Sequence, residues 1–155
     1  MIGVVRFLYL LGLGLWIGEI AVFSFLVAPA VFQTLGPTGA GNVVAAIFPG
    51  YYALGAVSGA TAFGLGLVLR SRSSRPGWWT GAVAAVALGL AATLWAGAVV
   101  HPRARRLRAA MQAAGDDSPA AGEFRRLHGR AVALNGAALV AGLVGLGLSA
   151  AALRQ

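Results

Sequence analysis

Four long apolar stretches dominate this 155-residue chain and restrict the folds open to it. They cover about residues 3–27, 41–69, 79–100 and 131–153. A helix needs roughly 20 mostly apolar residues to cross a hydrocarbon core about 30 Å thick, so each stretch is long enough to span a bilayer. Backbone polar groups inside a bilayer must be paired within the protein, which favours helices. We therefore predict an all-α protein, a four-span transmembrane helical bundle that forms a single domain over residues 1–155.

The charge balance agrees with a membrane protein and argues against a soluble one. Apolar residues make up 59% of the chain and charged residues 10%, whereas a soluble domain usually carries about 25% charged residues. The net charge of +8 comes from arginines that crowd into short stretches between the apolar runs. A soluble nucleic-acid binder would spread such charge over a polar surface, so we expect no nucleic-acid partner. The absence of Cys excludes disulfides, thiolate catalysis and Cys-based metal sites.

The three connections between the stretches differ in charge and length. The first, Pro29–Ala40, is uncharged, and the second, Arg70–Gly77, is short and basic. The third, about residues 101–130, is long, and we predict short helical segments in it. Its Arg103–Arg108 part reads as a basic amphipathic helix, which suits anionic lipid headgroups. Within the second span, Pro49 removes one backbone hydrogen bond, so we expect a kink there.

Arginine counts on the two sides of the membrane predict the orientation. The side of the termini carries five: Arg6, Arg70, Arg72, Arg75 and Arg154. The other side carries seven: Arg103, Arg105, Arg106, Arg108, Arg125, Arg126 and Arg130. Because cytoplasmic loops carry an excess of basic residues, we expect the seven-arginine side to be cytoplasmic and both termini to lie outside.

Polar residues in the spans fall at one depth. Glu19 lies eight residues before the end of the first span, which is roughly 12 Å at 1.5 Å per residue. Thr93 lies eight residues before His101, and Asn135 lies seven after His128, which gives a similar depth from the same side. An ionisable residue inside a span is by default a functional hypothesis. The plainer alternative is hydrogen-bond glue between helices, worth about 1 kcal/mol per bond.

These residues and their neighbours at the interface form our candidate ligand-binding set. The set comprises Glu19, Thr93, His101, Arg103, His128 and Asn135. We assign no catalytic residue and expect no cofactor. The alternative is a metal or haem held by His101 and His128, because imidazole is the commonest metal ligand. Those two histidines lack the short spacing of a dedicated metal-binding motif.

Small residues repeat along the third span at four-residue intervals. The stripe comprises Gly77, Gly81, Ala85, Gly89, Thr93 and Gly97. Shorter versions occur in the other spans, with Gly14 and Gly18 in the first and Gly55 and Gly59 in the second. Such stripes let helix backbones approach closely. They favour packing within the chain, with a homo-oligomer as the alternative.

Several short motifs together resemble the transmembrane protein 205-like family, whose bacterial members carry a domain of unknown function. The motifs are Trp16-Ile17-Gly18, Pro29-Ala30-Val31-Phe32, Ile47-Phe48-Pro49, Pro102-Arg103, Phe124-Arg125-Arg126-Leu127-His128-Gly129 and Leu134-Asn135. The resemblance implies a four-span helical bundle, and we expect a bacterial inner (cytoplasmic) membrane. The family has no settled activity, so the resemblance leaves the mechanism open. Its motifs map to the side of Glu19 and the histidines, where we predict a polar vestibule opened by Pro49.

The first functional interpretation is a non-enzymatic multi-pass membrane protein whose polar cluster binds a small ligand or cation, or supports a partner complex. A metal- or haem-binding redox or metal-handling protein is the second. The third is a structural bundle that acts by oligomerising.

Overall fold

The computed structural model describes residues 1–115 and 118–154, and this part of the chain is helical, without strands. The five α-helices are α1 (Ile2–Val22), α2 (Ala28–Ser71), α3 (Gly77–Trp95), α4 (His101–Ala114) and α5 (Pro119–Leu153). Two π-helical segments, η1 (Phe23–Val27) and η2 (Ala96–Val100), join α1 to α2 and α3 to α4. The predicted all-α class is thereby confirmed.

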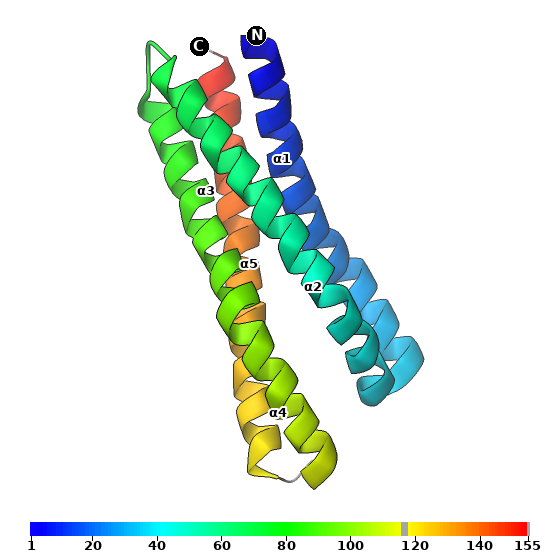
Figure 1. The fold of residues 1–155 in the computed structure, drawn as a ribbon. Helices are drawn as coiled ribbons and strands as arrows, with labels where there is room; N and C mark the ends of the chain where they lie inside the picture. Colours follow the sequence, from blue (N-terminus) through cyan, green and yellow to red (C-terminus); the bar gives the residue numbers. More distant parts are fainter. Residues whose placement is uncertain (116–117, 155) are drawn as a thin grey trace.

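Figure 1 shows how these helices are arranged. The helices α1 and α2 run side by side in opposite directions, and α3 and α5 do the same. Both chain termini lie at one end of the molecule, and α4 lies at the other. Three helical stretches are long and apolar enough to cross a membrane, namely Ile2–Ser71, Gly77–Ala114 and Pro119–Leu153. The predicted membrane character therefore has a structural basis.

The first of these stretches reverses direction at Gly36, which lies inside α2. Residues 28–35 continue in the direction of α1, and residues 37–71 return beside it (Figure 1). We call this reversal the turn between α1 and α2. Gly36 has φ 66° and ψ 175°, a backbone conformation open mainly to glycine. Pro37 follows directly, and proline is well suited to the first turn of a new helix. The backbone angles inside α2 depart from helical values at Gly36, and the kink expected at Pro49 is not confirmed. A proline keeps φ near the helical value, whereas a reversal needs the positive φ that glycine provides.

Each π-helical segment ends two residues before a proline. In η1 the Ala28 N–H donates to the Phe23 carbonyl, and Pro29 follows. In η2 the His101 N–H donates to the Ala96 carbonyl, and Pro102 follows. A proline ring clashes with the carbonyl one turn earlier, and a wider π turn relieves that clash. The first and third predicted spans therefore continue into the next helix through a widened turn.

The long third connection is shorter than expected, because the flanking helices extend into it. The predicted helical segments of this connection are α4, which continues from η2, and the first part of α5. Gly115, with φ 90°, ends α4, and the Ser118 hydroxyl caps α5 by accepting from the Ala121 N–H at 3.4 Å. Asp116 and Asp117, which lie between them in the sequence, are outside the described residues.

The best-packed part of the core lies towards the end that carries the termini. Tyr9 and Trp16 of α1 are fully buried. The Tyr9 ring meets Trp79 edge-on at 5.5 Å, and its hydroxyl forms a 2.6 Å hydrogen bond with the Ser149 hydroxyl. These contacts tie α1 to α3 and α5. Because lipid tails are as apolar as these rings, close packing and interhelical hydrogen bonds are what stabilise the association of such helices in a membrane.

Small residues bring the helices together within the chain. A Cβ on Gly89 of α3 would lie 2.7 Å from the Trp16 ring, and one on Gly12 would lie 3.0 Å from the Ser58 carbonyl oxygen. The stripe of α3 thus serves intramolecular packing at Gly89, as the first interpretation predicts. By contrast, Gly14 and Gly18 have open space around their Cβ positions, so the expected packing role of that pair is not found. Gly12 takes that role in α1.

Candidate functional site

The carboxyl group of Glu19 lies inside the helical assembly. Both of its oxygen atoms are buried, and neither has a hydrogen-bond partner among the described residues. Oε1 lies against Gly55 of α2, where an added Cβ would collide with it. A charged carboxylate is very costly to bury without a partner. Glu19 is therefore the leading candidate for a functional group in the described part of the chain.

Thr93 of α3 and Glu19 of α1 both lie against Gly55 of α2. Its Cγ2 atom would lie 3.2 Å from a Cβ on Gly55, so α1, α2 and α3 converge at this level. The Trp16 Nε1–H donates to the Thr93 hydroxyl oxygen at 3.3 Å. That oxygen retains acceptor capacity, since a hydroxyl has two lone pairs. The equal depth predicted for Glu19 and Thr93 matches this geometry.

Asn135 of α5 lies one helical turn away, in a hydrogen-bonded chain that crosses three elements. The Tyr51 hydroxyl donates to Asn135 Oδ1 at 2.8 Å, and Asn135 Nδ2 donates to the Ser24 hydroxyl of η1 at 3.4 Å. Tyr51 precedes Gly55 by four residues on α2, which places it on the same helix face. We call the residues at this level the Glu19 cluster. It comprises Trp16, Glu19, Ser24, Tyr51, Gly55, Thr93 and Asn135.

Four members of the Glu19 cluster were absent from the predicted ligand-binding set: Trp16, Ser24, Tyr51 and Gly55. Helical spacing could have found two of them. Tyr51 lies one turn before Gly55, and Ser24 lies five residues after Glu19, near the end of the same helix. The sequence gives no comparable signal for the hydrogen bond between Trp16 and Thr93, because it depends on how α1 and α3 pack.

His101 lies beyond the Glu19 cluster, at the start of α4, among aromatic rings. Its ring centre is 5.6 Å from that of Phe48 and 5.5 Å from that of Tyr52. Its Nε2 atom is buried and has no hydrogen-bond partner in the described part of the chain. Tyr52 in turn contacts Tyr51 at 5.3 Å between ring centres. Aromatic packing therefore links His101 to the cluster.

The structure does not bring His128 and Arg103 to the Glu19 cluster. His128 is exposed on α5 and stacks on Phe124 at 6.2 Å. Arg103 pairs with Glu123 at 3.6 Å, and both side chains are more than half exposed. His128 lies two turns before Asn135 on the same face of α5. That face is buried only where a neighbouring helix covers it, and His128 is exposed. Among the described residues, neither His128 nor Arg103 forms a hydrogen bond or ion pair with Glu19.

The two histidines have different neighbours, which bears on a shared metal or haem site. His101 contacts Phe48 and Tyr52, whereas His128 contacts Phe124. Across residues 1–115 and 118–154 there is no group of three or more His, Asp or Glu side chains that could hold a metal ion.

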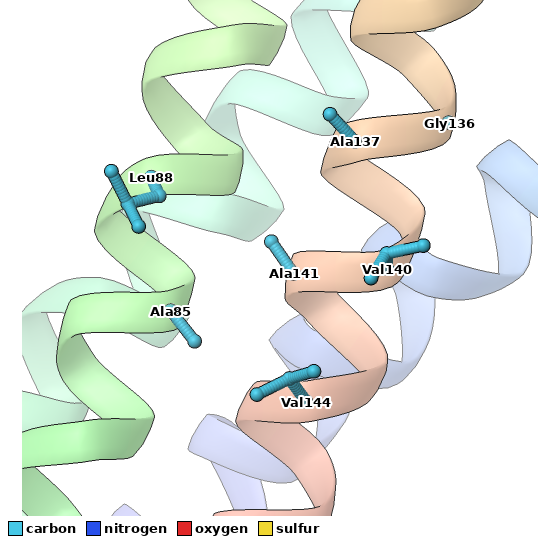
Figure 2. Close-up of a pocket in the computed structure, with 7 residues that line it drawn as sticks. All are labelled: Ala85, Leu88, Gly136, Ala137, Val140, Ala141 and Val144. Atoms are coloured by element: carbon cyan, nitrogen blue, oxygen red, sulfur yellow. The ribbon is translucent and has the colours of Figure 1, made fainter.

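The two best-formed hollows lie away from the Glu19 cluster. Figure 2 shows a shallow apolar groove between α3 and α5. Its lining consists of Ala85, Leu88, Gly136, Ala137, Val140, Ala141 and Val144. The second hollow lies beside Arg75 and Trp78, at the end of the termini. Neither is the polar vestibule expected from the sequence, because aromatic rings such as Phe48 and Tyr52 occupy the region between His101 and Tyr51.

Comparison with known proteins places the chain in a family. Residues 11–113 match the model of a family described as a domain of unknown function (DUF4149), which is more than half of the chain. The chain belongs to this family. The matched residues of this DUF4149 protein run from α1 almost to the end of α4, so they include Glu19, Gly55 and Thr93. No curated protein and no solved structure matches the chain.

Proposed function

We propose that this DUF4149 protein is a non-enzymatic integral membrane protein that binds a monovalent cation, in exchange with a proton, at Glu19. The observation that carries the proposal is the carboxyl group itself. Both oxygens are buried without a hydrogen-bond partner among the described residues. A protein that used Glu19 only to join helices would pair these oxygens with donors, because unpaired buried polar groups cost stability.

Charge balance supports a monovalent cation over a divalent one. Glu19 is the only charged residue between Arg6 and Arg70, and the neighbouring polar side chains of the cluster are neutral. One carboxylate neutralises one positive charge. A divalent ion would leave a net charge in a medium of low dielectric constant, which is unfavourable.

Neutral oxygen atoms near Glu19 support a cation site. Thr93 lies against the same Gly55 as Glu19, and its hydroxyl oxygen, which accepts from Trp16, keeps one acceptor site. Asn135 Oδ1, one helical turn away, accepts from Tyr51. Pro29 and Pro102 have no N–H to donate, so carbonyl oxygens one turn before each proline lose a helical donor. Transporters bind cations at backbone carbonyls freed where a helix is broken, and we propose that the carbonyls freed at these prolines play the same part from the α4 side of the Glu19 cluster.

Four membrane spans are part of the proposal. Because α1 and α2 lie side by side, the stretch Ile2–Ser71 supplies two crossings, and α3 and α5 supply the others (Figure 1). The arginine counts favour a cytoplasmic position for α4 and an outside position for both termini. The motif pattern also favours a relationship with the transmembrane protein 205-like family and a location of the protein in a bacterial inner membrane.

Cation-dependent thermal stability of the detergent-purified protein tests the proposal. Wild type, Glu19→Gln and Glu123→Gln are unfolded in sodium, potassium and choline chloride at matched ionic strength. Glu123 is an exposed carboxylate on α5, so Glu123→Gln is the matched control. A bound cation stabilises the native state by about 2.7 kcal/mol at a hundred times its Kd.

We expect one of the small cations to raise the Tm of wild type and of Glu123→Gln in a saturable manner, relative to choline. Glu19→Gln should lack this rise. An equal response to all three salts, or the same response in Glu19→Gln, would overturn the cation site.

A structural bundle that oligomerises is a second candidate, and the groove between α3 and α5 favours it (Figure 2). Glu19→Gln would then alter stability without altering any response to cations. The metal or haem interpretation has less support, because His101 and His128 lie among different residues.

A further inference from the structure

The hairpin formed by α4 and the first part of α5, residues 101–130, is the most strongly charged part of the molecule. We call it the basic hairpin. It contains seven arginines, and Glu123 is the one acidic residue in the portion of it that the structure describes. Glu123 pairs with Arg103, which leaves six arginines without an acidic partner among the described residues. The full sequence of the hairpin also holds Asp116 and Asp117, so its seven arginines and three acidic residues give a net charge of +4.

Arg108 fixes the level of the basic hairpin relative to the rest of the chain. Its Nη2 group donates to the Thr38 carbonyl oxygen at 2.9 Å and to Asn42 Oδ1 at 3.1 Å. Thr38 and Asn42 lie just after the reversal at Gly36. The middle of α4 and the turn between α1 and α2 are therefore at the same depth.

The turn between α1 and α2 has the composition of a segment held at a membrane surface. No charged residue occurs between Glu19 and Arg70, and the turn exposes Phe32 and Leu35. Such a segment is unfavourable in bulk water and, because its reversal leaves backbone groups unpaired, also unfavourable in hydrocarbon. The headgroup layer satisfies both constraints, so Arg108 and its neighbours on α4 lie at that layer too.

Helix length leads to the same position. The 35 residues of α5 span roughly 52 Å, whereas the hydrocarbon core is about 30 Å thick. The excess of α5 lies on the α4 side, where its arginines are, and the first material it meets is the headgroup layer. Arg105, Arg106, Arg125 and Arg126 are all exposed in this part of the molecule.

We propose that the basic hairpin binds the headgroups of anionic phospholipids in the leaflet that surrounds it. The guanidinium groups of Arg105, Arg106, Arg125 and Arg126 contact the phosphates, for which their forked donor geometry is suited. The partner is lipid and not a soluble acidic protein, because Arg108 holds the hairpin at the level of the uncharged turn. The proposal is independent of the cation site at Glu19.

Native mass spectrometry of the full chain tests it directly. The protein is equilibrated in detergent micelles that contain equal amounts of phosphatidylglycerol and phosphatidylcholine, and the retained lipids are counted. Each basic residue near an anionic membrane surface contributes about a fivefold gain in binding. We expect wild type to retain phosphatidylglycerol preferentially, and Arg105→Gln/Arg106→Gln/Arg125→Gln/Arg126→Gln to lose at least roughly tenfold of that preference.

The chain offers a matched control at its other end. Arg70→Gln/Arg72→Gln/Arg75→Gln removes exposed arginines from the turn between α2 and α3, and it should cost clearly less of the lipid preference than the hairpin substitutions do. Replacement of the four hairpin arginines by Lys keeps the charge and should restore most of the preference, which separates lipid binding from a folding defect. Equal retention of the two lipids by wild type, or an equal loss in both arginine-to-glutamine variants, would overturn the proposal. Loss of phosphatidylglycerol on addition of soluble glycerol phosphate would do the same, because the site would then recognise a free phosphate.

Discussion

The Glu19 carboxyl group lies against Gly55, so the residue at one of these positions limits which residues fit at the other. A side chain at position 55 would occupy the space of the Glu19 carboxyl group. Glycine at position 55 therefore makes room for the Glu19 carboxyl group as well as for helix packing.

Gly55→Ala should destabilise the protein by about 1–3 kcal/mol through overpacking against Glu19 and Thr93. In a Glu19→Ala background the same substitution should cost less, because the colliding carboxyl group is gone. The measurement is a double-mutant cycle on thermal unfolding in detergent. Gly50→Ala is the control on the same helix, since a Cβ there meets no atom within 4 Å. Additive effects of Gly55→Ala and Glu19→Ala would contradict the contact.

At the scale of the helices, two prolines explain the widened turns that flank the Glu19 cluster. The segment η1 follows Glu19 within four residues, and η2 follows Thr93 within three. Both widened turns therefore lie on the same side of the cluster, towards α4. This arrangement links the positions of Pro29 and Pro102 in the sequence to the backbone around the candidate cation site.

Pro102→Ala should restore a backbone donor at the end of η2 and return this turn towards α-helical geometry. We expect a gain in stability of about 1 kcal/mol and a weaker rise of Tm with the bound cation, because a freed carbonyl regains its helical partner. Thermal unfolding with and without the cation measures both. Pro119→Ala, at the first turn of α5 where no N–H is needed, should change neither quantity. A cation response that Pro102→Ala leaves unchanged would remove the carbonyls of η2 from the site.

Sequence reasoning located the apolar helices but misplaced their interruptions. Hydropathy and length suffice to find the long stretches, because a span must be apolar over about 20 residues. The reversal is expected from the sequence as an open connection from Pro29 to Ala40, whereas helix continues to Leu35 and turns at Gly36. The Gly36-Pro37 pair carried the relevant signal, since it combines a residue that tolerates positive φ with one that starts helices.

At the candidate site, residue spacing predicts the depth of a side chain along its helix but not the side chains that surround it. A rise of 1.5 Å per residue was enough to place Glu19 and Thr93 at one level, where both lie against Gly55. Spacing identified the helix face of His128 but not its neighbours, and the structure leaves that side chain exposed. Which helix covers which face depends on tertiary packing, for example the contact of Trp16 with Gly89.

On the scale of the whole molecule, the polar groups of the spans and most of the arginines lie towards one end. The Glu19 cluster, the aromatic rings around His101 and the basic hairpin follow one another from the interior to the α4 end. The end of the termini is instead closed by the packed aromatic core of Tyr9 and Trp79. Aromatic rings also lie between the Glu19 cluster and the α4 end, so exchange of a cation or proton with water at that end requires these rings to move.

Membrane orientation can be tested with single cysteines, because the natural chain has none. Ser74→Cys lies in the turn between α2 and α3, and Gln112→Cys lies near the end of α4; both positions are exposed. In intact cells a membrane-impermeant maleimide should label Ser74→Cys, and it should label Gln112→Cys only after lysis. The reverse pattern would invert the orientation, and labelling of both from one side would contradict the four-span arrangement.

The most direct test of the cation site is chemical labelling of Glu19 by the lipid-soluble reagent dicyclohexylcarbodiimide, which modifies protonated carboxyl groups in apolar surroundings. Labelling of the detergent-purified full chain is followed by peptide mass spectrometry in choline chloride and in the stabilising salt. We predict that Glu19 is modified in choline chloride and that the cation protects it in a saturable manner. The Glu19→Gln variant should show no modification at this position. Modification of Glu19 at one rate in every salt would contradict the account.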